Sequence, residues 1–437
     1  MPAAPVSAEE LPSAPFAVYN TVLLGALPLL VPALVAASLA GRRVGLTWRG
    51  QLGLELPAAP PCAGSLWLQA SSIGETLAVR PLIDGLRGLF PATPVLLTGS
   101  TPEGQRVARE RSGADLFATF PFDLPWVLPR YFDTYSPRAC LMVETEIWPN
   151  LIRQCHRRRV PLVLLNGRIS PARMGRYRLL RPFYSAFLAG FALMLMQTRE
   201  DAERLLEMGA PPERVLVAGD LKYDSLPLPA ARSGRAAPLD GLTAVVAGST
   251  HPGETEQVLE VYRRLLERFP GLALVLAPRH PETAEAACRH AGRLGLAWER
   301  RSQGGQARAG AALVLDTMGE LLSYYEGAAA AFVGGSLVPV GGHSLLEPAS
   351  LGRPVLYGPH AFNFRDAASL LERKGGGFPV AGAEQLESRL AEFLSAPAVS
   401  ADAGRRAQAA VAGRRGATAR TLEALRELLE GRRGEAR

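Results

Sequence analysis

The sequence predicts an α/β protein built from two doubly wound, Rossmann-like domains that face a cleft. Short apolar runs alternate with helical patterns along most of the chain, which is typical of parallel sheets covered by helices on both faces. Prolines and glycines interrupt this alternation at 226–242, and the alternation then starts again. The chain has 437 residues, enough for two domains that each have a core.

The first domain is expected at 46–225, with a helix at 76–90. Its apolar runs are short and bounded by turn residues, as buried strands are. These predicted strands are 66–70, 95–98, 139–143, 161–165 and 191–196.

The second domain is expected at 243–400, after the linker, with a helix at 254–269. The tail at 401–437 is rich in alanine and arginine and is predicted to be helical. The predicted strands of this domain are 244–247, 273–276, 311–315, 328–333 and 354–357.

The N-terminal segment, 1–45, is predicted to be a membrane anchor. Its stretch 16–40 is uncharged and mostly apolar, with two glutamates before it and two arginines directly after it. By the positive-inside rule, this pattern places the rest of the chain in the cytoplasm. Pro28 and Pro32 leave two arrangements open, a helix that spans the bilayer and a kinked helix that lies in its surface.

The net charge is +7, and arginines are concentrated in one region of the first domain. Such a run is usually a solvated helical face, but it also suits an anionic partner. Few aromatic residues are interleaved with it, which argues against nucleic acid. The four cysteines are far apart, which indicates a reducing compartment and no metal site. The arginines are Arg153, Arg157, Arg158, Arg159, Arg168, Arg173, Arg176, Arg178 and Arg181.

The clearest candidate binding element is the glycine-rich stretch 334–349. A predicted strand precedes it and a helix start follows it, with His343 or Ser344 near the N-cap and Glu347 in the first turn. Strand, glycine loop and helix form a phosphate-binding layout, and Glu347 is placed to accept from ribose hydroxyls. The plain alternative is a tight turn with an ordinary capping box.

Acidic residues follow two predicted strands of the first domain, at the edge where open α/β sheets bind ligands. Glu75 lies at a helix start after Gly74, as a general base or as a carboxylate that only stabilises the helix dipole. Glu144 and Glu146 follow the strand at 139–143, where two acids are costly unless they are paired or used.

Further candidates are cationic or lie at helix starts. Lys222 could neutralise a developing negative charge, and Arg279 is a natural phosphate ligand directly after a strand. The segment 248–254 opens the first helix of the second domain as another possible anion site. The six histidines are scattered and have no metal-ligand spacing.

Together these motifs resemble the 3-deoxy-D-manno-octulosonic acid (Kdo) transferases of lipopolysaccharide synthesis, membrane-associated enzymes of the GT-B architecture. The resemblance runs from about residue 64 to residue 364. Two positions depart from the usual family pattern, Ser344 in place of Asn and Gly167 in place of Ala. The matching segments, in order, are SSIGE, VETEIWPN, NGRIS, AGDLKYD, AGSTHPGE, APRHPE, LDTMGEL, VGGSLVPVGGHSLLEPA and FNF.

The resemblance implies that Glu75 is the general base and that Glu144 and Lys222 stabilise charge. The reaction it implies is an inverting transfer of Kdo from CMP-Kdo to the lipid A precursor, without a metal or other cofactor. It also implies attachment to the cytoplasmic face of the inner membrane. The implied CMP-binding residues are Pro278, Arg279, Met318, Gly319, Glu320, Ser344, Leu345, Leu346 and Glu347.

Two alternatives remain at the level of sequence. One is another GT-B glycosyltransferase that uses a UDP-sugar, and the other is a membrane-bound relative without catalytic activity. In the expected mechanism, Glu75 takes a proton from a lipid hydroxyl, and amides of the glycine loop, Arg279 and helix dipoles hold CMP.

Overall fold

The computed structural model describes residues 11–39, 48–56, 64–228 and 238–435. The chain forms two compact units. The first comprises Met1–Ser225 together with Arg415–Arg437, and the second comprises Leu226–Arg414. The expected linker at 226–242 thus begins where the second unit begins, and most of it lies outside the described residues.

The sheet of the first unit has seven strands in the order β3-β2-β1-β4-β5-β6-β7, and every neighbouring pair is parallel. This order confirms the predicted doubly wound sheet, because the chain moves outward from β1 first to one side and then to the other. The strands are β1 (Ser65–Gln69), β2 (Val95–Gly99), β3 (Leu116–Thr119), β4 (Pro137–Val143), β5 (Leu162–Gly167), β6 (Leu193–Met196) and β7 (Val215–Val217).

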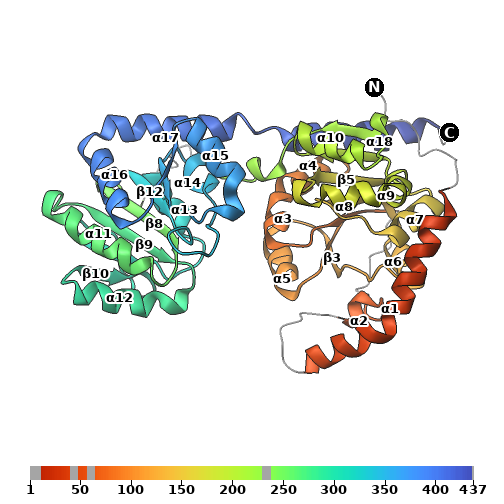
Figure 1. Ribbon diagram of the computed structural model, residues 1–437, viewed down its shortest axis with the longest axis horizontal. Coiled ribbons are helices and arrows are strands. Elements are labelled where there is room, and N and C mark those ends of the chain that lie inside the picture. Colours follow the sequence, from red (N-terminus) through yellow and green to blue (C-terminus); the bar gives the residue numbers. More distant parts are fainter. Residues whose placement is uncertain (1–10, 40–47, 57–63, 229–237, 436–437) are drawn as a thin grey trace. The chain divides into compact units, whose positions relative to one another are not determined.

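Helices surround this sheet (Figure 1). Alternate residues of β1 face opposite cores, with Trp67 in one cluster and Leu66 and Leu68 in the other. A strand buried on both faces is apolar throughout, which is why the strands appear as continuous runs in the sequence. The helices are α1 (Ser13–Leu39), α2 (Trp48–Gln51), α3 (Ile73–Ala78), α4 (Arg80–Leu89), α5 (Pro102–Arg111), α6 (Leu128–Tyr135), α7 (Pro149–Arg157), α8 (Met174–Leu179), α9 (Arg181–Leu188), α10 (Arg199–Glu207) and α18 (Ala417–Glu435), with 3-10 turns η1 (Pro171–Arg173), η2 (Pro212–Arg214) and η3 (Leu221–Tyr223).

The second unit repeats this plan with seven parallel strands in the order β10-β11-β9-β8-β12-β13-β14. Val245 and Val246 of β8 again face two different cores. The strands are β8 (Ala244–Thr250), β9 (Ala273–Pro278), β10 (Ala297–Arg300), β11 (Ala311–Val314), β12 (Ala330–Val333), β13 (Val355–Tyr357) and β14 (Gly377–Pro379). The helices are α11 (Thr255–Arg268), α12 (Ala284–Arg293), α13 (Leu321–Gly327), α14 (Leu346–Ser350), α15 (Arg365–Arg373), α16 (Ala383–Ser395) and α17 (Pro397–Ala412), with 3-10 turns η4 (Pro281–Thr283), η5 (Arg301–Gln303) and η6 (Phe362–Phe364).

Two predicted helices are divided in the structure. The helix expected at 76–90 is α3 followed by α4, with Val79 between them and a proline at the start of α4. Proline cannot donate the backbone hydrogen bond that a continuous helix needs, so the break falls there. The helical tail expected at 401–437 is divided between α17 of the second unit and α18 of the first.

Helix α18 is anchored to the first unit by one carboxylate. Asp224 accepts hydrogen bonds from the N–H groups of Gly416 at 2.7 Å and Thr418 at 2.5 Å. The Arg420 Nε also donates to the carbonyl of Ala218 at 2.7 Å. Because Leu425 is fully buried in the core that also holds β1 and β4, α18 completes one face of this sheet.

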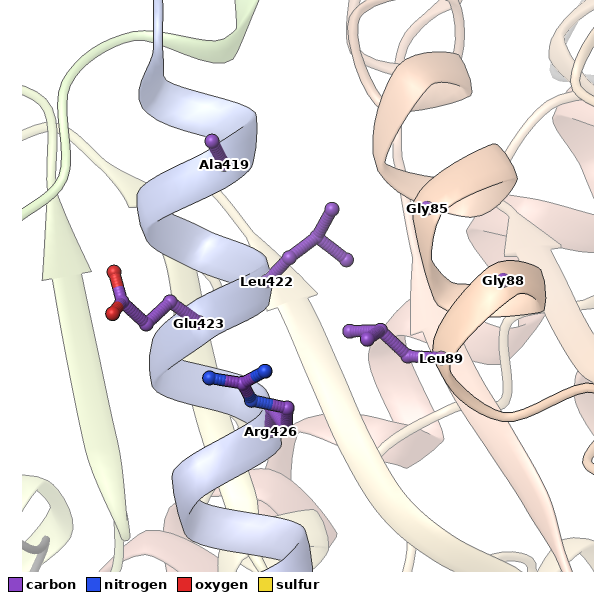
Figure 2. A pocket seen from close by; sticks show the side chains of 7 residues that line it. All are labelled: Gly85, Gly88, Leu89, Ala419, Leu422, Glu423 and Arg426. Atoms are coloured by element: carbon purple, nitrogen blue, oxygen red, sulfur yellow. The ribbon is translucent and has the colours of Figure 1, made fainter.

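A groove of about 360 Å³ lies between α4 and α18 (Figure 2). Gly85 and Gly88 present no side chains to it, while Leu89 and Leu422 point into the space between the helices. A Cβ atom on Gly85 would lie 2.3 Å from Leu422 Cδ1, so glycine at this position allows the close approach of α18. The groove therefore follows from helix packing and lies away from the carboxyl ends of the strands.

Helix α1 begins on the surface of the first unit. Phe16 is 1% exposed and meets the ring of Phe187 edge to face at 5.1 Å. Asn20 and Asn150 exchange amide hydrogen bonds of 2.9 and 2.8 Å. No helix within the described residues is both long enough and apolar enough to cross a bilayer. The first turns of the expected anchor are thus packed against protein.

Candidate active site

Each sheet has a switch point, where two neighbouring strands lead into connections that run in opposite directions. In the first unit the strands are β1 and β4, and in the second they are β8 and β12. Ligands of open α/β sheets bind beyond the carboxyl ends of such strands. Of the predicted site residues, Glu75, Glu144 and residues 344–347 follow switch-point strands, and Arg279 follows β9, the neighbour of β8; Lys222 follows the edge strand β7 and residues 318–320 follow β11.

Glu75 lies in the first turn of α3, directly after β1. Its carboxylate accepts from the Ser71 N–H at 2.8 Å and from the Ser72 hydroxyl at 2.7 Å, and the Glu75 N–H donates to Ser72 Oγ at 3.2 Å. This pattern is a variant of the capping box, in which the carboxylate accepts from the N–H of Ser71, one residue before the N-cap Ser72. The two hydrogen bonds fix the orientation of the carboxylate, and each oxygen keeps a further lone pair for a substrate proton.

Glu146 connects the loop after β4 with the loop after β1. One carboxylate oxygen accepts from the Ser71 hydroxyl at 2.6 Å, and the other accepts from the indole N–H of Trp148. Burial raises the pKa of Glu146 and outweighs these two hydrogen bonds, which lower it. Ser71 therefore contacts both acids, and Glu75 and Glu146 belong to one hydrogen-bonded group.

Glu144 and Lys222 form an ion pair of 3.0 Å in the same unit. Glu144 has a backbone φ of 61°, in the left-handed region that disfavours non-glycine residues, and such strain often occurs at functional sites. Burial lowers the pKa of Lys222, but attraction to Glu144 and Asp220 outweighs it, so the pKa is raised and the ammonium is retained. The structure thus brings the two predicted charge-stabilising residues together.

Three histidines meet at the switch point of the second unit. His251 and His343 have parallel rings, with 2.8 Å between their Nε2 atoms, and His280 meets the His251 ring edge to face. Burial, followed by the positive charge of Arg279, lowers the pKa of His343 to about 4. Burial also lowers the pKa of His251. The two imidazoles are therefore neutral at pH 7. One ring donates its Nε2–H to the Nε2 atom of the other, in a single hydrogen bond.

Arg279 follows β9, after the buried Pro278, and its side chain is exposed. Within the described part of the chain, its guanidinium forms no hydrogen bond or ion pair, although its charge acts on His343 and Glu347. Burial raises the pKa of Glu347, against the lowering effect of the Ser344 hydroxyl and of Arg279. An unpaired guanidinium at the end of a strand is well suited to bind a phosphate.

Several backbone amides of the glycine loop already donate hydrogen bonds within the protein. The N–H groups of Gly335, Ser336 and Leu337 donate to the carboxylate of Glu254 at 2.7, 3.1 and 2.8 Å. The N–H groups of Gly341 and Gly342 donate to the carbonyl of Gly335. These five amides therefore already have acceptors within the protein, which argues against the expectation that they bind CMP.

The remaining predicted nucleotide residues differ in their surroundings. Helix α14 begins at Leu346 with Leu345 at its N-cap and no side-chain cap, so Ser344 lies next to the N-cap, as expected, but does not cap the helix. Leu345 is fully buried, which removes its side chain from the surface. Ser344, Leu346 and Glu347 are partly exposed beside it.

The segment after β11 is the other predicted part of the nucleotide site. Met318 is 73% exposed, and Gly319 has a φ of 88°. The Glu320 carboxylate is paired with Arg301 at 2.7 Å, and this pair holds the pKa of Glu320 below its usual value. Glu320 therefore serves a local ion pair, and β11 is separated by β9 from the switch point.

The arginine-rich region is exposed, and some of its arginines form ion pairs with acidic side chains. Arg158 pairs with Asp133 at 2.7 Å, and Arg178 pairs with Glu207 at 2.8 Å. Among the described residues, no group of histidine, cysteine or acidic side chains is arranged to hold a metal ion.

From the sequence, His251 and Glu254 had no role beyond a possible anion site at 248–254, and His280 had none. Glu254 resembled an ordinary acid at a helix start. His251 and His343 are 92 positions apart, and only the pairing of β8 with β12 brings them together. Two features of the sequence could have indicated these residues: Glu254 lies directly before a helix, and His251 and His280 lie after the ends of two strands.

Comparison with solved structures supports the two-unit architecture. A UDP-GlcNAc 2-epimerase from Neisseria meningitidis has a TM-score of 0.59, with 13% identity over 83% of this chain and 99% of the other. A glycosyltransferase from Rickettsia africae has a TM-score of 0.53, with 11% identity over 84% and 99%. Two parallel-sheet α/β units with polar groups at both switch points define a protein with the GT-B type of fold.

The particular family follows from the sequence comparisons. A family model for "3-Deoxy-D-manno-octulosonic-acid transferase (kdotransferase)" matches residues 42–225. The 3-deoxy-D-manno-octulosonic acid transferase of Bordetella pertussis is 35% identical over 89% of this chain and 94% of its own length. The enzyme of the same name from Haemophilus influenzae is 30% identical over 94% and 98%. The chain belongs to the 3-deoxy-D-manno-octulosonic acid transferase family, which confirms the resemblance seen in its motifs.

Proposed function

We infer that this chain transfers Kdo from CMP-Kdo to the lipid A precursor in lipopolysaccharide biosynthesis. The observation that carries this inference is the 35% identity over nearly the whole of both chains to a transferase of that name. The chemistry at the two switch points is compatible with it, because acids suited to proton transfer lie in one unit and an unpaired cation lies in the other.

We propose Glu75 as the general base. A lipid hydroxyl loses its proton to the Glu75 carboxylate while its oxygen bonds to the anomeric carbon of Kdo. The bond from that carbon to the CMP phosphate breaks, and CMP leaves with the electron pair, so the configuration at carbon is inverted. Ser71 and Ser72 hold the carboxylate in place through the two hydrogen bonds described above. Glu146 is the alternative base, since burial raises its pKa and so strengthens its carboxylate as a proton acceptor.

We assign the neutralisation of charge to the pair Glu144 and Lys222 in the first unit. The Lys222 side chain is 40% exposed, and we propose that its ammonium contacts a substrate carboxylate or phosphate while it remains paired with Glu144. Removal of Lys222 should leave Glu144 without its cation and weaken binding of anionic substrates. A Lys222→Ala variant with normal KM values and normal turnover would contradict this assignment.

For the nucleotide, we propose that Arg279 binds the phosphate of CMP, beside the neutral imidazoles of His251 and His343. The partly exposed Ser344 and Glu347 are proposed to contact the ribose or the base, while the buried Leu345 only supports them. Arg279 would offset the negative charge that develops on the leaving group, and the proposed reaction needs no metal.

We propose that the protein works at the cytoplasmic face of the inner membrane. Val18, Val22 and Leu24 of α1 are 48%, 68% and 40% exposed, and exposed apolar residues on one helix suit the surface of a bilayer. The arginine-rich region is proposed to attract the phosphates of the lipid. Sedimentation with anionic vesicles tests this, and equal recovery in the supernatant for the full chain and a variant lacking residues 1–40 would refute it.

The reaction itself is tested by incubating the purified protein with CMP-Kdo and lipid A precursor and measuring the mass of the lipid product by mass spectrometry. A mass increase of whole Kdo residues is expected. A UDP-sugar tested in parallel addresses the alternative donor, and CMP should inhibit where UDP does not. Transfer from the UDP-sugar alone, or no transfer from either donor, would exclude the proposed function.

A further inference from the structure

Glu254 is the most heavily hydrogen-bonded carboxylate at the switch point of the second unit. It lies directly before α11 and is fully buried. Besides the three amides of the glycine loop, its Oε2 accepts from the N–H of His251 at 3.2 Å. A buried carboxylate is stable only where hydrogen bonds replace its hydration, and here four backbone N–H groups do so.

These bonds join two loops that are far apart in the sequence. His251 belongs to the loop after β8, whereas Gly335, Ser336 and Leu337 belong to the loop after β12. The neighbouring glycines are shaped for this contact. A Cβ on Gly334 would lie 2.6 Å from Glu254 Oε2, and a Cβ on Gly335 would lie 3.0 Å from the His343 ring. His251 thus belongs to this network through its N–H, and His343 is linked to it through its hydrogen bond with His251.

Backbone N–H groups of a glycine loop that converge on one point are a usual binding site for a phosphate. In this chain the converging groups surround a carboxylate that belongs to the protein itself. Since that carboxylate satisfies the three donors and carries negative charge, a second anion gains nothing at this position. A ligand phosphate is left with the unpaired Arg279, which directly follows the neighbouring strand β9.

We propose that Glu254 is a positioning residue for nucleotide binding, a built-in anion that fixes the glycine loop and directs the phosphate of the donor to Arg279. This proposal rests on the proposed function, because it assumes a nucleotide ligand in the second unit. Glu254 does not touch the reacting atoms, so its effect is on nucleotide affinity and on the KM for CMP-Kdo rather than on the chemical step.

The test compares Glu254→Gln with two controls in the full-length protein. Glu256→Gln makes the same chemical change two residues away, where the carboxylate accepts only the N–H of Gly253, at 2.7 Å. Tyr262→Phe removes a buried hydrogen bond of 2.8 Å to the carbonyl of Leu272, elsewhere in the same unit. Hydrogen exchange of the peptide covering 334–340, CMP affinity by calorimetry, and KM and kcat for CMP-Kdo are measured on each variant.

In Glu254→Gln, we expect exchange at 335–337 to become fast, and CMP affinity to fall about tenfold or more, as for loss of charge-assisted hydrogen bonds. KM should rise by a similar factor, with kcat changed less than about twofold. Both controls should keep protection and CMP affinity, although Tyr262→Phe lowers thermal stability. A purely structural role of Glu254 would instead lower stability and the active fraction and leave KM unchanged.

A second variant separates the position of the charge from its presence. Glu254→Asp keeps the carboxylate but shortens the side chain by one methylene. We expect it to lose CMP affinity and the protection of the 335–337 amides from hydrogen exchange. This variant replaces Glu254→Gln if the latter does not fold. The proposal is overturned if a folded Glu254 variant loses the protection of the 335–337 amides from hydrogen exchange but keeps its CMP affinity. It is also overturned if these amides stay protected in the variants. If the wild-type protein neither binds CMP nor transfers Kdo, the proposed function fails and the directing role of Glu254 fails with it. Normal wild-type transfer with unchanged affinity in the variants overturns only the proposal for Glu254.

Discussion

The substitution Glu75→Gln distinguishes a catalytic carboxylate from one that only caps α3. Gln keeps the size of the side chain and one carbonyl oxygen, which can still accept from the Ser71 N–H now bonded at 2.8 Å. The Ser72 hydroxyl can rotate and accept from the new amide, so little hydrogen bonding is lost. The neutral amide cannot take a proton, and we expect turnover to fall about 10²–10⁴-fold, the usual contribution of a general base.

The matched control is Ser72→Ala, which removes the N-cap and leaves the Glu75 carboxylate. Loss of an N-cap costs about 0.5–2 kcal/mol of stability. We therefore expect Ser72→Ala to be the less stable variant and to lose far less turnover than Glu75→Gln, because the N–H of Ser71 still orients the carboxylate, whereas Glu75→Gln should be stable and nearly inactive. Thermal unfolding, CMP calorimetry and transfer rates on both proteins make the comparison. Near-normal turnover in Glu75→Gln would refute the reasoning and transfer the base role to Glu146, which Glu146→Gln then tests.

Three further predictions concern other parts of the molecule. Arg279→Ala should weaken CMP binding by about 1.5–3 kcal/mol, with partial recovery in Arg279→Lys, and calorimetry that gives wild-type affinity would remove this residue from the site. The pKa of His343 is depressed to about 4 in the folded state, so its unfolded form binds more protons between about pH 6.5 and 4. Stability should therefore fall on acidification through this window, and unfolding temperatures of His343→Asn should show a weaker pH dependence than the wild type; equal slopes would count against the burial effect. Truncation before Arg415 removes three leucines of α18 that are at most 4% exposed, each worth about 1.5–3 kcal/mol, so the first unit should unfold while the second still binds CMP. If hydrogen exchange showed that the first unit of the truncated protein is still folded and unfolds cooperatively, the role given to α18 would be contradicted.

The central strands could be predicted from the sequence because they are buried on both faces. The run at 95–98 is β2 to within a residue, and the run at 139–143 is β4 apart from its first two residues. Edge strands were missed because they are short or partly exposed: β7 has three residues and is mostly exposed, and β10 has four residues and is half exposed. Strands of this kind have no continuous apolar run to reveal them.

The candidate site was predictable as a set of motifs and less so as a set of contacts. Glu144 and Lys222 were assigned related roles from separate motifs, and their ion pair spans 78 positions. The occupation of the glycine loop by Glu254 could not be predicted, because a capping acid and a buried internal anion look the same along one helix. Only the register of β8 against β12 decides which amides that carboxylate meets.

The return of the C-terminus to the first unit has a consequence for synthesis on the ribosome. The second unit, Leu226–Arg414, is continuous, whereas the first needs residues from both ends of the chain. Domains usually fold in the order in which they emerge. Here the first unit, although made first, still lacks the helix that covers one side of its sheet when the second is already complete. Part of the apolar surface beside β1 and β4 stays uncovered until α18 has left the exit tunnel, and during that interval the nascent chain is most in need of chaperones.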